Sequence, residues 1–181
     1  MVRYEVTRGE TNSIEVEIPE AVQINRITDS TQAVSDWRVQ RDGDRNGAGI
    51  ATIFLDRKVK GEFPFEIQYE RLIGAGEEQL KRFNIPLLKA KSVHRQRGMI
   101  ALLAGKELAL RPTEEEGVSK VGENQLPPAI RQAIERTVAH TYKYAAPGSS
   151  LTVEAAAPER RQGKLDAQVN TLISLGDVNG D

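Results

Sequence analysis

Cysteine and histidine, the residues that most often act as nucleophiles or bind transition metals, are scarce in this sequence. There is no cysteine, and there are only two histidines, His94 and His140. Disulfides, thiolate metal sites and cysteine nucleophiles are therefore excluded. A catalytic zinc typically takes three protein ligands, often with two histidines close together in the sequence, whereas these two lie far apart. We expect structural or surface roles for both and predict no metal site and no cofactor.

Carboxylates are abundant, but their spacing singles out no catalytic pair. Asp and Glu together number 26, and two of them could perform general acid–base chemistry on a glycoside. The sequence lacks the nucleophile elbow, the P-loop and the dinucleotide fingerprint. We therefore predict a protein that is not an enzyme, with a carboxylate-dependent glycoside-type hydrolase as one alternative.

An oxygen-rich stretch, Asp42–Gly47, has acidic or amide side chains at alternate positions followed by glycine. This pattern resembles the first half of an EF-hand calcium loop. The second half departs from it, because Gly49 occupies the eighth position and Ile53 the twelfth, where a bidentate glutamate closes the site. We predict a connection between two strands, in which Asp, Asn and Gly are favoured, and leave calcium contact open.

The C-terminal residues carry a similar pattern. Asp177, Asn179 and Asp181 alternate with other residues after Gly176, and the six residues 176–181 resemble the opening of a dockerin-type calcium repeat. The resemblance ends before the glycine and the closing acid of such a repeat. It implies that the chain is a piece of a larger extracellular modular protein. A strand pattern that begins almost at residue 1 and has no signal peptide before it favours the same interpretation. We leave the compartment open but favour an extracytoplasmic or secreted protein.

A second candidate for ligand binding is basic. Lys89, Lys91, Arg95 and Arg97 occupy every second position, so in one extended strand they would share a face around Val93. Such a face could bind an anion or an acidic partner, or it could protect an edge strand from aggregation. Residues 84–111 contain no aromatic side chain that could stack on a base. Because the net charge of the chain is also -1, we expect no nucleic-acid partner.

The aromatic candidates for ligand binding are Trp37, Tyr142 and Tyr144. Trp37 is the only tryptophan and, if exposed, could stack on a sugar ring. Its position between Val34 and Val39 favours a core role instead. A carbohydrate-binding module would require these rings to lie exposed in a line.

The elements that must position these residues are mostly strands. Apolar residues alternate with polar ones at residues 14–18, 37–39, 50–55, 63–69 and 151–155, the period of half-buried strands. Turn residues separate these runs at short intervals, which favours an antiparallel β-sandwich. Met99–Leu103 and Glu107–Leu110 flank a Gly-containing turn and predict a hairpin. One stretch, residues 128–140, has helical periodicity with prolines at its start, and we predict a single short helix there.

Length and composition favour one globular domain over residues 1–181, with a fallback boundary near residues 73–78. Hydrophobic residues make up 39%, and the longest apolar run, residues 99–105, is too short to span a membrane. We therefore expect a non-catalytic structural or protein-interaction module. Its partners would be other domains of a parent chain or another protein. A carbohydrate-binding module, with a polysaccharide partner, is a further alternative.

Overall fold

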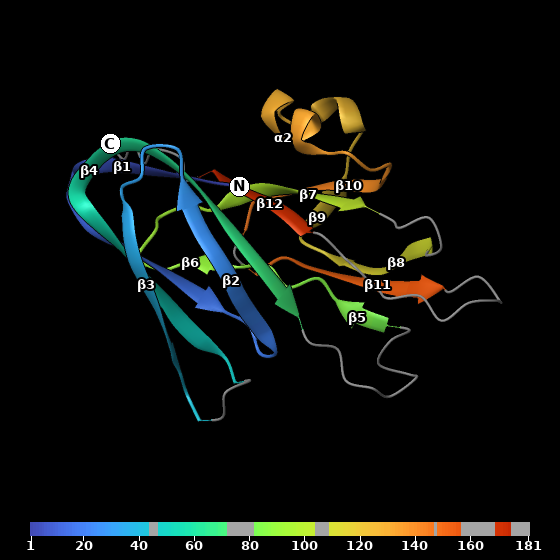
Figure 1. Ribbon diagram of the computed structural model, residues 1–181. Coiled ribbons are helices and arrows are strands. Elements are labelled where there is room, and N and C mark those ends of the chain that lie inside the picture. The colour runs from blue at the N-terminus through green and yellow to red at the C-terminus, as the bar shows by residue number, and fades with distance from the viewer. Residues whose placement is uncertain (44–46, 72–81, 104–108, 147, 157–168, 175–181) are drawn as a thin grey trace. The chain divides into compact units, whose positions relative to one another are not determined.

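The computed structural model describes residues 1–43, 47–71, 82–103, 109–146, 148–156 and 169–174, the last of these by backbone alone (Figure 1). Its strands are β1 (Val2–Ile18), β2 (Val22–Asp29), β3 (Val34–Arg41), β4 (Gly49–Arg71), β5 (Arg82–Asn84), β6 (Lys89–Ala90), β7 (Arg97–Leu103), β8 (Ala109–Glu116), β9 (Val118–Lys120), β10 (Val138–Tyr144), β11 (Ser150–Ala156) and β12 (Val169–Ser174). Two short helical segments are described, the 3-10 helix η1 (Glu123–Gln125) and the α-helix α2 (Pro128–Ala133). The predicted mostly β, antiparallel fold is confirmed, and it is consistent with a β-sandwich.

The chain divides into two compact units. Unit 1 comprises residues 1–72, 86–97 and 173–181, and unit 2 comprises residues 73–85 and 98–172. The single domain expected from the sequence stays a prediction, and the fallback boundary near residues 73–78 lies outside the described residues.

Strand β4 is the centre of unit 1. Strand β1 follows one edge of β4, from Val2 opposite Phe65 to Ile18 opposite Gly49. Strands β2 and β3 share the other edge, β2 along residues 65–71 of β4 and β3 along residues 49–55. Beyond β1 lie β6, which is antiparallel to it, and the end of β12, which is parallel. Unit 1 is therefore one sheet built around two unusually long strands.

The two long strands bend in the middle, so that the sheet of unit 1 packs against itself. The register of β1 against β4 shifts twice between Val6 and Ser13, as it does at β-bulges, and β4 curves back visibly in Figure 1. Gly9 and Gly61, on either side of the bend, both have positive φ, which glycine adopts without strain. Residues from both halves therefore form one hydrophobic cluster: Val2, Ile14, Val16, Ile18, Val22, Ile24, Ile27, Ala33, Ala51, Ile53, Leu55, Val59, Phe63, Phe65, Ile67 and Leu88.

Pro64 illustrates how this arrangement accommodates proline. It pairs with Arg3 of β1 on one side. On the other side, the ladder with β3 ends at Leu55 and that with β2 starts at Phe65. Pro64 therefore lies in an interval where β4 has an open edge, the place in a sheet where a residue without an N–H is tolerated.

Asp29 closes the turn that joins β2 to β3. Its Oδ1 accepts hydrogen bonds from the backbone N–H of Thr31 at 2.7 Å and of Ala33 at 3.2 Å, and its Oδ2 accepts one from Val34 N–H at 2.8 Å. Burial acts to raise the pKa of Asp29, but these hydrogen bonds outweigh it and hold the pKa below its ordinary value. The ionised carboxylate therefore stabilises the turn that aligns β3 along β4.

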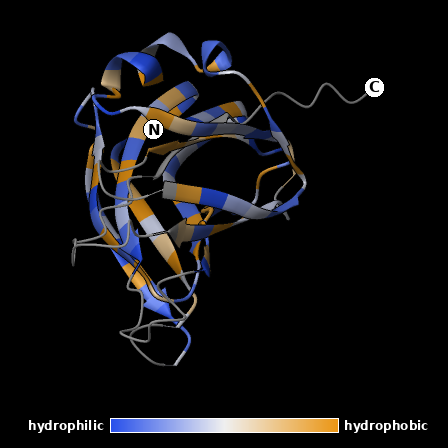
Figure 2. Cartoon of the chain, turned by 90° about the vertical axis from the view of Figure 1, so that its right-hand side faces the viewer, coloured by the Kyte–Doolittle hydropathy of each residue, from blue (hydrophilic) through white to orange (hydrophobic). Residues whose placement is uncertain are grey.

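Unit 2 contains strands of two sheets. Strands β7, β10 and β9 follow one another at one end of the first sheet, and the second sheet has the order β5-β11-β8. Two hydrogen bonds run from β10 to β8: His140 Nε2 to the Leu110 carbonyl oxygen at 2.9 Å, and the Tyr142 hydroxyl, which donates to Glu115 Oε1 at 2.8 Å. Buried side chains of Ile100, Leu102, Leu110, Leu126, Ile130, Leu151 and Val153 fill this unit. Hydrophobic and hydrophilic residues alternate along several of the strands (Figure 2).

The predicted helix over residues 128–140 begins as expected but is much shorter. It ends at Ala133, and Ile134 already has extended φ and ψ. From Val138 the chain is strand β10, paired with β7 from Val138 opposite Leu103 onward. Thr137 and Val138 are β-branched, and their place in the helical stripe fits the start of a strand equally well. Within the described segments, no helix is long and apolar enough to cross a membrane.

The hairpin predicted for residues 99–110 is wrong. Strand β7 pairs with β10, whereas β8 pairs with β11 in the other sheet of unit 2. The connection itself, residues 104–108, lies outside the described residues. Strands separated by a turn-like sequence need not pair, because tertiary burial can direct each to a different sheet.

Candidate functional site

A cleft of about 460 Å³ lies in unit 1, where β1 and β3 end and β4 begins. This volume is in the range of small-ligand sites, about 300–1,000 Å³. The polar side chains that line it are Glu17, Gln40, Asp42 and Lys89, all in exposed residues. The remaining lining residues are Ile18, which is buried, and Pro19, Ala48, Gly49, Ile50 and Leu87. The cleft thus combines apolar surface with two carboxylates, an amide and one ammonium group.

The strand register explains why four of these residues meet. Gln40 of β3 lies opposite Ile50 of β4, Ile50 lies opposite Glu17 of β1, and Glu17 lies opposite Lys89 of β6. They form one row across four strands, and directly opposed residues have Cβ atoms about 4.5–5.5 Å apart. Successive side chains along a strand point to opposite faces of the sheet. Because neighbours of the row, such as Val16 and Ala51, belong to the hydrophobic cluster of unit 1, the row itself points away from the cluster. We call this side of the β3-β4-β1-β6 sheet the outer face.

Lys89 is positioned by a buried glutamine. Gln96 is 2% exposed, and its Nε2 donates to the Leu88 carbonyl oxygen at 2.8 Å while its Oε1 accepts from Ala90 N–H at 3.0 Å. Both backbone neighbours of Lys89 are therefore held by one side chain. An ion pair between Lys91 Nζ and Glu15 Oε2 at 3.8 Å and a hydrogen bond from Lys91 N–H to the Glu15 carbonyl oxygen add to this support.

The other side of the cleft is organised around Gly49 and Arg41. A Cβ atom on Gly49 would lie 2.5 Å from the Gln40 carbonyl oxygen, so only glycine permits this close approach of β3 to β4. The Arg41 guanidinium donates to the carbonyl oxygens of Gly47 and Val22. Asp42 N–H donates to the Ala48 carbonyl oxygen at 3.2 Å. These contacts place Asp42 at the rim.

Of the basic residues proposed as one stripe, only Lys89 lines the cleft. Strand β6 ends at Ala90 and β7 begins at Arg97. Between them, Ser92 has φ of 57°, which is incompatible with a continuous strand. The shared strand face for Lys89, Lys91, Arg95 and Arg97 is therefore wrong. The two lysines belong to the outer face of unit 1, while Arg95 and Arg97 follow the irregular segment as exposed residues.

The three aromatic candidates do not form an exposed platform. Trp37 is half-buried and packs against the hydrophobic cluster of unit 1. Tyr142 and Tyr144 are 0% and 4% exposed in unit 2. Burial raises the pKa of the Tyr142 hydroxyl, and the hydrogen bond to Glu115 and the negative charge of that carboxylate raise it further. Both tyrosines are therefore buried in unit 2 rather than exposed for stacking.

Of the two stretches with calcium-like patterns, Asp42–Gly47 lies between two strands of unit 1. Asp42 and Gly43 follow β3, and Gly47 and Ala48 precede β4, so the stretch connects two adjacent strands. Residues 44–46 and 176–181 lie outside the described residues. Among the residues that the structure describes, no three acidic or histidine side chains gather as metal ligands would.

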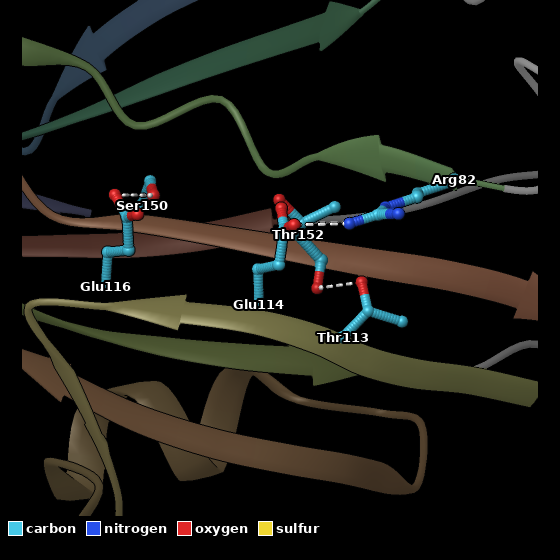
Figure 3. A network of polar contacts seen from close by, with 6 residues as sticks. All are labelled: Arg82, Thr113, Glu114, Glu116, Ser150 and Thr152. Carbon is cyan, nitrogen blue, oxygen red and sulfur yellow. Dashed lines mark hydrogen bonds and ion pairs between the residues drawn. The ribbon is translucent and has the colours of Figure 1, made fainter.

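Unit 2 has a polar face of a different kind (Figure 3). Arg82 forms an ion pair with Glu114, the Ser150 hydroxyl donates to Glu116 Oε2 at 3.3 Å, and the Thr113 hydroxyl donates to the Thr152 carbonyl oxygen at 3.3 Å. These side chains bind one another across β5, β11 and β8. The arrangement is that of a solvated sheet face, because Arg82, Glu114 and Glu116 are exposed and have polar partners on neighbouring strands.

Sequence reasoning identified Asp42 and Lys89 but missed Glu17, Gln40, Ile50 and Gln96. The first three are ordinary residues of alternating strands, and only the register across four strands brings them together. No protein-family model, curated protein or solved structure matches the chain.

Proposed function

We propose that this chain is a non-catalytic interaction module that binds another protein, or another domain of a larger chain, through the cleft of unit 1. The observation that carries this proposal is the composition of the cleft. Apolar side chains, including Ile50 and Leu87, lie among exposed groups of both signs. Protein interfaces combine these features, since an apolar centre supplies affinity and a polar rim supplies specificity.

The outer face next to the cleft supports the same function. Phe54 and Ile50 are half-buried on it, although both point away from the hydrophobic cluster. The Arg38 guanidinium lies 5.7 Å from the centre of the Phe54 ring and forms an ion pair with Asp36 at 3.5 Å. An apolar strip along β4 is thus flanked by charged side chains, and it extends the surface available to a partner beyond the cleft.

The proposal is tested by selecting random peptides displayed on phage against the full chain. Selected peptides should lose at least tenfold in affinity for Ile50→Arg, which places a charge among the apolar residues of the cleft. Gln68→Arg is the matched control, because Gln68 is an exposed residue near the other end of the same strand, outside both the cleft and the strip from Ile50 to Phe54. Failure to select any peptide, or equal losses with both variants, would overturn the proposal.

A carbohydrate-binding module remains the second candidate, although the burial of Trp37, Tyr142 and Tyr144 argues against a stacking platform built from them. A thermal-shift measurement with polysaccharide fragments distinguishes the two functions. A ligand at 100 times its Kd stabilises the folded state by about 2.7 kcal/mol, which is roughly 5–10 °C for a chain of this length. A shift of this size with a sugar would favour the carbohydrate function.

A glycoside-type hydrolase is the third candidate, because Glu17 and Asp42 line one cleft. Both residues are exposed, whereas a general acid at neutral pH needs an apolar environment. Hydrolysis of a glycoside panel that disappears in both Glu17→Gln and Asp42→Asn would replace the interaction function. An extracytoplasmic location and the absence of nucleic-acid partners stay predictions.

A further inference from the structure

The cleft has a carboxylate at one end and an ammonium group at the other. Asp42 follows β3 at one side, and Lys89 lies on β6 at the other, with β4 and β1 between them. Three strand spacings of about 4.8 Å separate β3 from β6, which is about 14 Å in all. An extended peptide of four residues has about this length, at roughly 3.3 Å per residue.

No ion pair among the described residues involves the charged groups at the two ends of the cleft. Among the described residues, ion pairs join Arg3 to Glu62, Arg38 to Asp36, Arg82 to Glu114 and Lys91 to Glu15. Asp42, Glu17 and Lys89 belong to none of these pairs. Glu17 is the neighbour of Lys89 in the ladder, and its negative charge reduces the attraction of Lys89 for an acidic group.

We propose that the cleft binds an extended segment of about four residues of a partner protein, with a basic side chain beside Asp42 and an acidic side chain beside Lys89. Apolar side chains of the segment pack between these ends on Ile50 and Leu87. The segment crosses the strands of unit 1 and therefore binds through its side chains. This inference rests on the interaction function proposed above and specifies the chemistry of the partner.

The test uses four tetrapeptides, acetylated and amidated, each with two central leucines. Their outer residues are arginine and glutamate, two arginines, two glutamates, or two glutamines. Titration of the ¹⁵N-labelled full chain by NMR gives the affinities and shows which amides move. The mixed-charge peptide should bind best, about two- to fivefold more tightly for each favourable ion pair, and should shift the amides of Glu17, Ile50 and Lys89.

Reversing the charge at either end of the cleft should change which peptide binds best. Asp42→Lys should weaken the mixed-charge peptide at least fivefold and make the double-glutamate peptide the best ligand. Lys89→Glu should instead favour the double-arginine peptide. The matched controls, Asp56→Lys and Lys60→Glu, change exposed residues of β4 that do not line the cleft, and they should leave the order of affinities unchanged.

Two outcomes separate this inference from the function on which it rests. Equal affinities for all four peptides, or an order that neither reversal changes, would overturn the charge arrangement. The interaction function would still stand if phage-selected peptides lost binding to Ile50→Arg. If no selected peptide depends on Ile50, both the function and the inference fail.

Discussion

Replacement of Gln96 by leucine tests whether its two hydrogen bonds stabilise the segment that carries Lys89. The substitution keeps a side chain of similar size but removes the amide that bonds to Leu88 and Ala90. A buried backbone group left without a partner costs about 1–3 kcal/mol. Two such groups predict a loss of about 2–6 kcal/mol. We expect a value near 3 kcal/mol, because Ala90 is only partly buried and leucine adds some apolar burial.

The free energy of unfolding is measured by urea titration of the full chain, and local opening by hydrogen exchange. Gln68→Leu is the matched control, since Gln68 is exposed and its side chain donates a hydrogen bond to the Glu66 carboxylate at the surface. It should change stability by no more than about 0.5 kcal/mol. Gln96→Leu should lower the midpoint and increase the exchange rate of the Ala90 amide.

The same variant should weaken peptide binding at the cleft, because Lys89 lies between the two backbone groups that Gln96 holds. If Gln96→Leu unfolds at the same urea concentration as Gln68→Leu and the Ala90 amide keeps its protection, the buried amide does not stabilise this segment. That result would refute the reasoning from hydrogen-bond satisfaction.

Three further predictions concern other parts of the fold. Asp29→Asn should lower stability by about 1 kcal/mol at neutral pH, because an amide nitrogen cannot accept the hydrogen bond that Oδ2 accepts from Val34 N–H. Because the pKa of Asp29 is lowered in the folded state, its contribution is present above the ordinary pKa and is lost as the pH falls through the lower, folded-state pKa. Unfolding titrations between pH 2 and 7 (about the range in which a carboxylate changes charge) should therefore show a shallower acid slope for the variant, and an unchanged slope would contradict this. Tyr142→Phe should cost about 1 kcal/mol. Since the pKa of Tyr142 is raised, the native chain should lose stability above the ordinary tyrosine pKa more steeply than the variant, and spectrophotometric titration should show one fewer late-ionising tyrosine in the variant. Gly117→Ala should destabilise by about 1–2 kcal/mol, because Gly117 has φ of 62° and an added Cβ would lie 2.8 Å from Ser149 Oγ. Gly148→Ala, whose added Cβ meets nothing within 4 Å, is the control, and equal melting temperatures for the two would exclude the strain.

The period-two patterns in the sequence predicted a mostly β chain and the buried faces of several strands. Phe63, Phe65 and Ile67 are buried as their alternation indicates, and so are Leu151 and Val153. A half-buried strand needs one apolar face. This requirement is local, so it is visible as an alternation of apolar and polar residues in the sequence. The stretch after Pro127 was harder to interpret, because the same apolar spacing fits a helix or the beginning of a strand. Pairing with β7 ended the helix early.

Strand pairing and the cleft were decided by the tertiary structure. Glu17, Gln40, Ile50 and Lys89 share one row only because three ladders have matching registers. A shift by one residue in any ladder would turn a whole strand over. The register depends on the bend in β1 and β4 and on burial of both sheet halves in one cluster, and neither can be read from residues near one another in sequence. The sequence by itself therefore determined a mostly β chain with its core positions, while long-range packing determined which exposed side chains meet.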